Sequence, residues 1–355
     1  MRFLILNTDY CEFLRWIYRM RPGLERGSYE EQMRARSDSM FGVADFYSAN
    51  LRRIGHEAID VHFNNQAMQA AWAREHGVKL MPRFLQPLDK WLYGILAAQI
   101  KYYKPDAIIT HDIGLSSRFF REMKPYFQLL IGQYAAPLPG EQDFSVYDLI
   151  VSSLPNLVDY FRDKGVKSEF LGLGFEPAVL NRLNNEEKGI SVSFVGNLSN
   201  FHSSRLRWLT FLCRHVNISI WGPSIKGASK EIKNSYCGPA WGIKMYQILR
   251  ISKLTLNHHI DVSGPYANNM RLFEATGVGT MLITDWKKNL NDMFEIGREV
   301  VAYQTPEECV EKIKYYLEHE DKREAIAQAG KRRTLSDYDY YCRMRDLADI
   351  VRKYI

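Results

Sequence analysis

The residues best suited to chemistry lie between Asp261 and Asp285, in the sequence DVSGPYANNMRLFEATGVGTMLITD. Tyr266 follows a Gly-Pro turn, and a helix is predicted from about Met270 to Thr276. Either Asn268 or Asn269 is a suitable N-cap for this helix. The start of such a helix presents free backbone N–H groups and a positive dipole end, which together would bind a diphosphate.

Two charged residues of this helix also suit a nucleotide. Arg271 lies in the first turn, where it opposes the helix dipole, so a nearby anion would explain its presence. Glu274 lies about one turn further on, and its carboxylate only accepts hydrogen bonds, which suits the two hydroxyls of a ribose. Gly277 and Gly279 would end the helix and allow a tight return into the next strand. An ordinary capped helix with a solvated Glu274 is an equally good interpretation of these residues alone.

A second candidate phosphate site follows the predicted strand that ends in Ser193-Phe194-Val195. Gly196 would let the backbone approach a phosphate, and Asn197 continues the loop through Leu198, Ser199, Asn200, Phe201 and His202. Arg205, on the next predicted helix, would neutralise that phosphate. A glycine turn with surface polar residues is the alternative. No GxGxxG or GxxxxGK[ST] motif occurs, so the sequence predicts neither a dinucleotide fingerprint nor a P-loop.

In the N-terminal half, His111 and Asp112 follow the apolar run Ile108-Ile109-Thr110. The end of a buried strand is a common place for a catalytic or acceptor-facing group, and we predict these two residues as catalytic. A structural hydrogen-bonding role is the alternative for His111. Further polar residues end other predicted strands and would line the same cleft: Asp9, Tyr10, Gln133 and Tyr134.

These residues must be positioned by strands and helices in alternation, because short apolar runs alternate with longer amphipathic stretches along the chain. In the first half we predict strands at 2–6, 58–63, 107–110, 128–131 and 149–151, with a helix from about Tyr29 to Ile54. In the second half we predict strands at 190–195, 218–221, 254–257, 280–284 and 300–303. This pattern predicts an α/β protein with two Rossmann-like, doubly wound parallel-sheet domains facing a cleft.

The domain boundaries follow from a change of composition near residue 170. We predict an N-terminal domain at 1–175, a polar linker within 181–189, and a C-terminal domain at 185–337. The last helix, 338–355, would either cap the second domain or cross back to pack on the first. Ligands of such sheets bind outside the carboxyl ends of the strands, so the candidate residues above lie where a site is expected.

Composition narrows the range of partners. The 355 residues include 47 basic and 41 acidic ones, a net charge of +6 that is spread along the chain. A nucleic-acid-binding protein usually has a clustered basic stripe, so we expect no nucleic acid partner. A mild positive excess suits an anionic small ligand or an anionic membrane surface.

Targeting and redox features favour a cytoplasmic protein. The five scattered cysteines show no metal-ligand spacing, so we expect free thiols in a reducing compartment and no metal site. The N-terminus MRFLILNTDY is predicted as a strand rather than a signal peptide, and no segment has the length of a transmembrane helix. Phe13 to Arg21 (FLRWIYRMR) would contact a membrane peripherally, at its inner face, or form a wall of the cleft.

The stretch NNMRLFEATGVGTMLITD resembles the nucleotide-binding core of retaining GT-B glycosyltransferases, and looks closest to the spore maturation protein CgeB-like group. Other segments are similar to the same proteins: FVGN at Phe194, ISKLTLNH at Ile251, LNDMFEIGREVVAYQTPEECVEKIKYYLEH at Leu290, YEEQ at Tyr29, FGVADFYSANLRRIGHEA at Phe41 and PLP at Pro137.

The resemblance implies that the C-terminal domain binds a UDP- or GDP-linked sugar as substrate, with no cofactor and no obligatory metal. The N-terminal domain would bind a glycan, lipid-linked or protein acceptor, in polysaccharide biosynthesis. Related retaining enzymes have two glutamates eight positions apart: Glu274 matches the second, the ribose binder, and Tyr266 occupies the place of the first, near the donor sugar. Arg205 would substitute for their phosphate-binding Arg/Lys pair. The alternatives are a GT-B sugar-nucleotide epimerase or hydrolase and a non-catalytic nucleotide-sugar-binding partner subunit.

Overall fold

The computed structural model describes residues 1–136, 143–198 and 203–355. The chain forms two compact units: unit 1 contains Met1–Gly172 and Arg343–Ile355, and unit 2 contains Leu173–Cys342. The polar stretch 181–189 therefore lies inside unit 2, and the end of the C-terminal helix lies in unit 1. The PLP segment at Pro137 and the loop residues Ser199 to His202, both quoted above, lie outside the described residues.

Unit 1 is built on a six-stranded parallel sheet with the order β2-β1-β3-β4-β5-β6. The strands are β1 Arg2–Asn7, β2 Glu57–His62, β3 Ala107–Thr110, β4 Leu129–Gln133, β5 Leu149–Ser152 and β6 Ser168–Phe170. The five strands predicted in this half are confirmed, and β6 is an additional short edge strand. β3 and β5 are buried along their whole length, as expected for strands of a parallel sheet with both faces covered.

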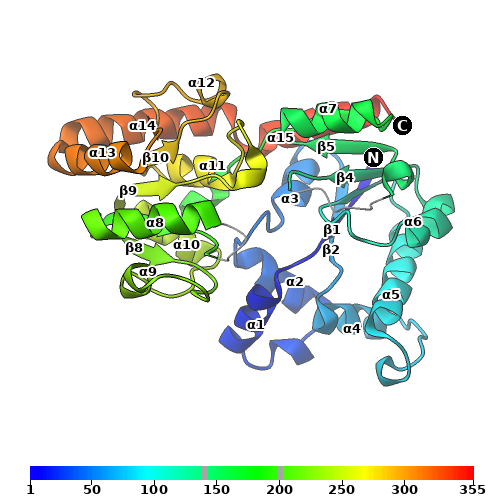
Figure 1. The fold of residues 1–355 in the computed structure, drawn as a ribbon. Coiled ribbons are helices and arrows are strands. Elements are labelled where there is room, and N and C mark those ends of the chain that lie inside the picture. The colour runs from blue at the N-terminus through cyan, green and yellow to red at the C-terminus, as the bar shows by residue number, and fades with distance from the viewer. Residues whose placement is uncertain (137–142, 199–202) are drawn as a thin grey trace. The chain divides into compact units, whose positions relative to one another are not determined.

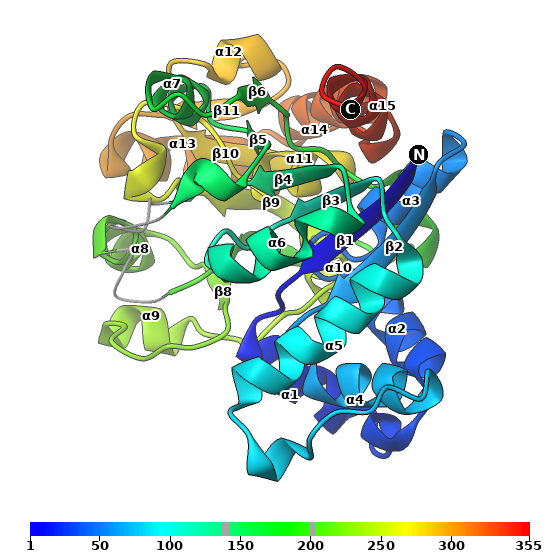
Figure 2. The ribbon, with the colours of Figure 1, turned by 90° about the vertical axis from the view of Figure 1, so that its right-hand side faces the viewer.

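Helices precede and follow these strands. They are α1 Cys11–Met20, α2 Tyr29–Asp38, α3 Phe46–Arg53, α4 Gln66–Glu75, α5 Leu88–Tyr103, α6 Ser117–Met123, α7 Pro155–Asp163 and α15 Tyr340–Arg352, with short 3₁₀ turns η1 Leu24–Arg26, η2 Arg83–Leu85, η3 Lys124–Tyr126 and η4 Phe144–Val146. Figure 2 shows α5 and α6 in front of the strands of this sheet. The Tyr354 hydroxyl, just after α15, donates to Glu169 of β6 at 2.9 Å.

The single helix predicted from Tyr29 to Ile54 is wrong, because the chain turns sharply between α2 and α3. Met40, Gly42 and Ala44 all have positive φ, of 54°, 61° and 41°. Two of these are not glycine, so this turn is a costly backbone conformation that tertiary contacts must hold. Arg36 supplies such a contact, since its Nη1 donates to the Phe41 carbonyl at 3.0 Å.

Unit 2 contains a five-stranded parallel sheet with the order β11-β10-β9-β7-β8. Its strands are β7 Ile190–Val195, β8 Ser219–Trp221, β9 Ser252–Asn257, β10 Met281–Asp285 and β11 Val301–Tyr303. All five lie where the sequence predicts them. The α/β fold class with two parallel sheets is thus confirmed (Figure 1).

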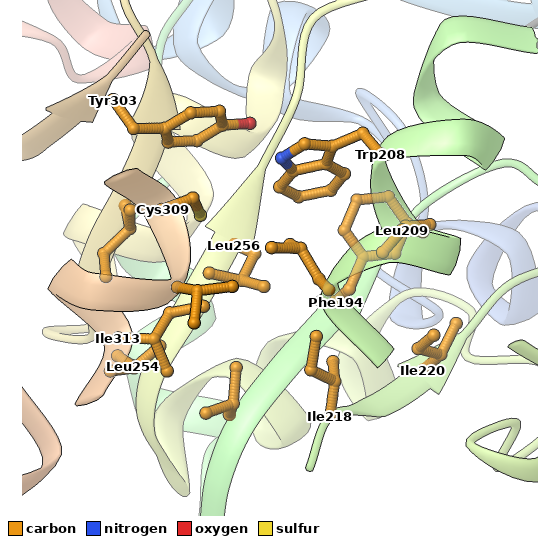
Figure 3. Close-up of a cluster of buried hydrophobic side chains, with 14 of the residues drawn as sticks. Phe194, Trp208, Leu209, Ile218, Ile220, Leu254, Leu256, Tyr303, Cys309 and Ile313 are labelled. Atoms are coloured by element: carbon orange, nitrogen blue, oxygen red, sulfur yellow. The ribbon is translucent and has the colours of Figure 1, made fainter. Parts of the chain in front are cut away.

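Helices connect the strands of this sheet and pack on it. The helices of unit 2 are α8 Ser203–His215, α9 Lys230–Asn234, α10 Ile243–Arg250, α11 Met270–Gly277, α12 Leu290–Met293, α13 Pro306–Glu318 and α14 Glu320–Asp337, with 3₁₀ turns η5 Pro177–Arg182 and η7 Asp261–Ser263. Figure 3 shows Trp208 and Leu209 of α8 beside Phe194 and Leu256 of the sheet, with Cys309 of α13. This apolar core fixes the strand ends from which the loops emerge.

None of the five cysteines, all of which lie in the described residues, forms a disulfide bond. None of the helices in the described part of the chain is both long and apolar enough to cross a membrane.

Candidate functional site

Both sheets reverse their strand order at one point, and the candidate residues lie at these two points. In unit 2 the chain leaves β7 for β8 on one side and returns to β9 on the other; in unit 1 it leaves β1 for β2 and returns to β3. Open α/β sheets bind ligands outside the carboxyl ends of the strands at such a switch point. The topology therefore places a candidate site beyond β7 and β9 in unit 2, and another beyond β1 and β3 in unit 1.

Helix α11 begins at the switch point of unit 2. The Arg271 Nε donates to the carbonyl of Val195, the last residue of β7, at 3.2 Å. The Asn269 side chain donates to Oδ1 of Asn257, the last residue of β9, at 2.8 Å. These two bonds hold the helix start over the two central strands, so its free N–H groups and positive dipole end lie at the site.

Asn269 is the N-cap of α11. Its extended backbone and the acceptance of the Leu272 N–H by its side chain are those of an N-cap, so of the two predicted candidates Asn269 takes this position and Asn268 precedes it, partly exposed. The cap is positioned in turn from the strands, because Asn257 Nδ2 donates to the Thr284 hydroxyl of β10 at 2.9 Å. A buried relay thus fixes the helix start.

Arg271 and Glu274 form a shielded ion pair on α11. The Arg271 Nη1 lies 2.7 Å from the Glu274 Oε2, and both side chains are largely withdrawn from water. Burial raises the pKa of Glu274, while the charge of Arg271 and a hydrogen bond from Tyr246 of α10 oppose that rise. The carboxylate still has lone pairs for further donors, which a ribose would supply. The ribose-binding role of Glu274 stays a prediction.

The Gly196 loop is held by Arg205, a residue that we predicted to contact phosphate. The buried guanidinium of Arg205 donates to the carbonyl of His258 from Nε at 3.2 Å and Nη2 at 2.7 Å, and to the carbonyl of Asn197 from Nη1 at 3.1 Å. Burial lowers the pKa of Arg205 to about 10, which leaves it charged at neutral pH. Arg205 therefore ties the loops after β7 and β9 together and brings a positive charge to the site.

The loop before α11 is clamped to the segment after β10. The Lys287 ammonium donates to the Gly264 carbonyl at 2.7 Å, and the Lys288 N–H donates to the Pro265 carbonyl at 3.0 Å. Asn289 bonds both backbone groups of Ala267.

Tyr266, at the position where the resemblance predicts a glutamate, lies in this clamped loop. The Lys288 ammonium is 4.2 Å from the centre of its ring. The position near the predicted donor is therefore cationic and aromatic instead of acidic.

The sequence did not single out the histidines after β9. The His259 ring, fully buried, lies 2.7 Å from Asp285 Oδ1. Burial by itself would raise the pKa of Asp285, but the hydrogen bond and charge of His259 outweigh it and hold that pKa well below its ordinary range. His258 stacks on Trp208 of α8, and its Nδ1 is 2.9 Å from the Tyr303 hydroxyl. In the sequence, their position directly after a predicted strand is the signal that could have indicated these two histidines.

In unit 1, His111 lies at the switch point with both ring nitrogens in contact with side-chain amides. Its Nδ1 is 2.8 Å from Asn7 Oδ1, and its Nε2 is 3.1 Å from Gln133 Oε1. Burial lowers the pKa of His111 to about 4, so the ring is neutral at neutral pH and donates from one nitrogen only. The Gln133 amide can turn its NH₂ group to the ring, because the Tyr47 hydroxyl, 2.8 Å from it, can then donate to its oxygen. This geometry favours a structural role for His111.

Asp112, the second residue of the predicted catalytic pair, has its carboxylate held by two hydrogen bonds. Its Oδ2 accepts from the Thr8 hydroxyl at 3.0 Å, and its Oδ1 accepts from the Gly114 N–H at 2.9 Å. The side chain is partly exposed and fixed in place by these bonds. Asp112 is therefore the better placed of the two to meet an acceptor hydroxyl, and its catalytic role stays a prediction.

Asp9 lies in a buried charge cluster. Both Nε and Nη2 of Arg36 donate to Asp9 Oδ1, at 2.9 and 2.8 Å, and His62 Nδ1 lies 2.9 Å from Oδ2. Burial would raise the pKa of Asp9, but His62 and Arg36 hold it well below its ordinary range. Tyr10, the next residue, is exposed.

Among the side chains that the structure describes, no three His, Cys, Asp or Glu residues are grouped so as to hold a metal ion. The structure brings together Gly196, Asn197 and Arg205 in one loop cluster, and Asn269, Arg271 and Glu274 at the start of α11.

The comparisons with known proteins report what this chain is similar to. The two parallel-sheet units have the GT-B fold, and residues 204–349 match the family model described as glycosyl transferase-like. The matched stretch includes Arg205, Tyr266, Arg271 and Glu274. A search of curated proteins finds no match.

Solved structures resemble nearly the whole chain. HepE of Anabaena in complex with UDP-glucose is 12% identical, with 99% of this chain and 100% of that chain covered and a TM-score of 0.65. A glycosyltransferase from Rickettsia africae is 11% identical, with 99% and 98% covered and a TM-score of 0.63. Sucrose-phosphate synthase from Thermosynechococcus elongatus is 11% identical, with 99% of both chains covered and a TM-score of 0.60. At these identities the likeness concerns the fold.

Proposed function

We propose that this protein is a glycosyltransferase that moves a sugar from a nucleoside diphosphate sugar to a hydroxyl acceptor. The main support is the start of α11, which is tied to the ends of β7 and β9 at the switch point of unit 2. The glycosyl transferase-like family match over 204–349 and the complexes of HepE with UDP-glucose and UDP support the same conclusion. We further propose that the protein belongs to the spore maturation protein CgeB-like group, which its sequence segments resemble.

In this proposal the diphosphate lies at the N-terminus of α11 and against the Gly196 loop. Negative charge grows on the diphosphate as the glycosidic bond breaks. The helix dipole, together with the charges of Arg271 and Arg205, stabilises that charge without a metal. Glu274 accepts hydrogen bonds from the ribose hydroxyls, and the Tyr266–Lys288 pair lies beside the donor sugar.

Unit 1 binds the acceptor, which is a glycan, a lipid-linked saccharide or a protein. Asp112 positions the acceptor hydroxyl, and the departing phosphate takes its proton on the same face of the sugar, so the configuration at the anomeric carbon is retained. The reaction needs no cofactor and belongs to polysaccharide biosynthesis in the cytoplasm. Asp112→Asn should spare nucleotide affinity and lower turnover; normal turnover of that variant would remove Asp112 from the mechanism.

A donor screen on the full chain tests the proposal. We expect UDP or GDP, and one of their sugar conjugates, to raise the unfolding temperature. Incubation of that conjugate with candidate acceptors should release the nucleoside diphosphate, with a rate that EDTA leaves unchanged. A product with the donor's anomeric configuration would support retention.

The same screen separates the alternatives. A sugar nucleotide that changes without any acceptor indicates an epimerase or hydrolase. Binding without turnover, across all acceptors, indicates a non-catalytic partner subunit. If no nucleoside diphosphate shifts the unfolding temperature, the donor site proposed at α11 is wrong.

A further inference from the structure

An exposed apolar tip lies between α4 and α5 of unit 1. Within five consecutive positions the side chains of Met81, Phe84 and Leu85 are 53%, 86% and 60% exposed. In both Figure 1 and Figure 2 this segment projects as a loop beyond the ends of α4 and α5. Single exposed apolar residues are normal in globular proteins, but three large ones grouped on one short loop indicate a surface that contacts something apolar.

The tip is built on an anchored base. Val78 and Leu80, in the same loop, pack against the buried cluster of Trp72, Ala73 and Ile95. The Val78 N–H donates to the Ala73 carbonyl at 2.9 Å, and the Leu85 N–H donates to the Pro82 carbonyl at 2.9 Å in the 3₁₀ turn η2. The loop therefore uses one set of apolar side chains to hold itself on unit 1 and presents the other set outward.

Within the tip itself the charge has one sign, with Glu75 and Asp89 directly beyond its two ends. From His76 to Leu88 the charged side chains are Lys79 and Arg83, both exposed, and this stretch contains no acidic residue. Large apolar side chains next to lysine and arginine are typical of segments that enter the interface of an anionic bilayer, where the cations contact lipid phosphates. Long basic side chains suit this position because their apolar stems also lie in the interface.

We propose that the segment Lys79–Leu85 inserts into an anionic lipid bilayer and attaches unit 1 to it peripherally. Phe84, Leu85 and Met81 enter the boundary between headgroups and acyl chains, and Lys79 and Arg83 contact lipid phosphates. The surface area of three side chains on one short loop is far smaller than the roughly 800 Å² that each partner contributes to a stable protein–protein interface. This favours a bilayer over a second protein.

This proposed membrane-contacting segment differs from the one that the sequence suggested, which was the helix at Phe13 to Arg21. Phe13 and Ile17 of α1 are buried in unit 1, so the apolar face of that helix packs inside the protein. What α1 leaves exposed includes Arg15 and Arg19, which would add positive charge to unit 1. The inference about Lys79–Leu85 does not depend on the proposed transferase activity.

Vesicle flotation of the full chain tests the proposal. We expect binding to vesicles of phosphatidylcholine mixed with phosphatidylglycerol, little binding to phosphatidylcholine alone, and weaker binding at high salt. The double variant Phe84→Ser/Leu85→Ser should bind at least about tenfold more weakly, since it removes two large apolar groups from the interface. Lys79→Glu/Arg83→Glu should also lose binding to the mixed vesicles.

Phe170→Ser is the matched control, because Phe170 of β6 is also in unit 1 and 53% exposed but lies outside the loop. It should bind like the unchanged protein, and all variants should keep the same unfolding temperature. The proposal is overturned if the protein ignores both vesicle types, if it binds neutral vesicles equally well, or if the Phe84/Leu85 double variant binds normally. A concentration-dependent dimer that only this double variant loses would replace the bilayer with a second copy of the chain.

Discussion

The Arg271 guanidinium lies 2.7 Å from the Glu274 carboxylate on α11, with the two side chains 13% and 7% exposed. This pair explains why an arginine occurs in the first turn of a helix, where the dipole disfavours it. The same pair holds Glu274, the proposed ribose ligand, in one orientation and so orders the site.

Glu274→Ala should weaken both the fold and the donor site. The variant leaves Arg271 shielded without its partner, which destabilises a protein by about 3 to 5 kcal/mol for a fully buried pair. It also removes a charge-assisted contact to the ribose, worth on the order of 1.5 to 3 kcal/mol of nucleotide binding. Thermal unfolding and nucleotide titration measure the two effects. Unchanged nucleotide affinity in a folded Glu274→Ala protein would rule out the ribose role.

Asn269→Ala tests the capped start of α11. Loss of this N-cap should lower the free energy of unfolding by about 1 kcal/mol and should also weaken nucleotide binding, because the helix start is then free to fray. Thr305→Ala is the matched control, since Thr305 caps α13 of the same unit by accepting from the Glu308 N–H. It should lose similar stability and keep its nucleotide affinity. Equal losses of affinity in both variants would show that α11 has no special role.

Gly222→Ala should disturb the Gly196 loop from outside the site. A Cβ atom on Gly222 would lie 2.5 Å from the Gly196 carbonyl oxygen, so the backbone of that loop must move. We expect weaker nucleotide binding from a protein that still folds. Gly189→Ala, in the same unit, meets nothing within 4 Å and should leave binding unchanged. Normal binding by Gly222→Ala would separate the Gly196 loop from the donor site.

Two histidines should make the folded state sensitive to mild acid. Burial lowers the pKa of His111 and of His258 from 6.5 to about 4, so the folded state favours the neutral rings. Their contribution to stability is complete above pH 6.5 and is lost as the pH falls to about 4, with a slope of about 1.4 kcal/mol per pH unit for each proton.

The unfolding temperature should fall as the pH is lowered from 6.5 to about 4, and His111→Gln and His258→Gln should each flatten this pH dependence. The lowered pKa values of Asp9 and Asp285 act below their ordinary value of 3.8, so they contribute at lower pH. A histidine variant with the unchanged slope would contradict the assignment.

The outline of this protein could be predicted from sequence because strands and capped helices depend on residues close together in the chain. The apolar runs that end in Val195 and Asn257 and the asparagine that caps α11 are such local features, and these strands and this helix lie where they were predicted. The turn between α2 and α3 was missed because a distant contact stabilises a backbone that local preference disfavours. Arg36 bonds the Phe41 carbonyl of this turn and is itself held by Asp9, which follows β1.

Only the tertiary structure decided what each candidate side chain contacts. Arg205 meets the carbonyls of two loops, and His111 uses both ring nitrogens within unit 1. The sequence likewise offered Phe13 to Arg21 as a membrane contact or a wall of the cleft, whereas the structure buries Phe13 and Ile17 and exposes Phe84. The physical reason is the same in each case. Burial and hydrogen-bond partners come from residues far apart in sequence, and their packing is settled when the whole unit folds.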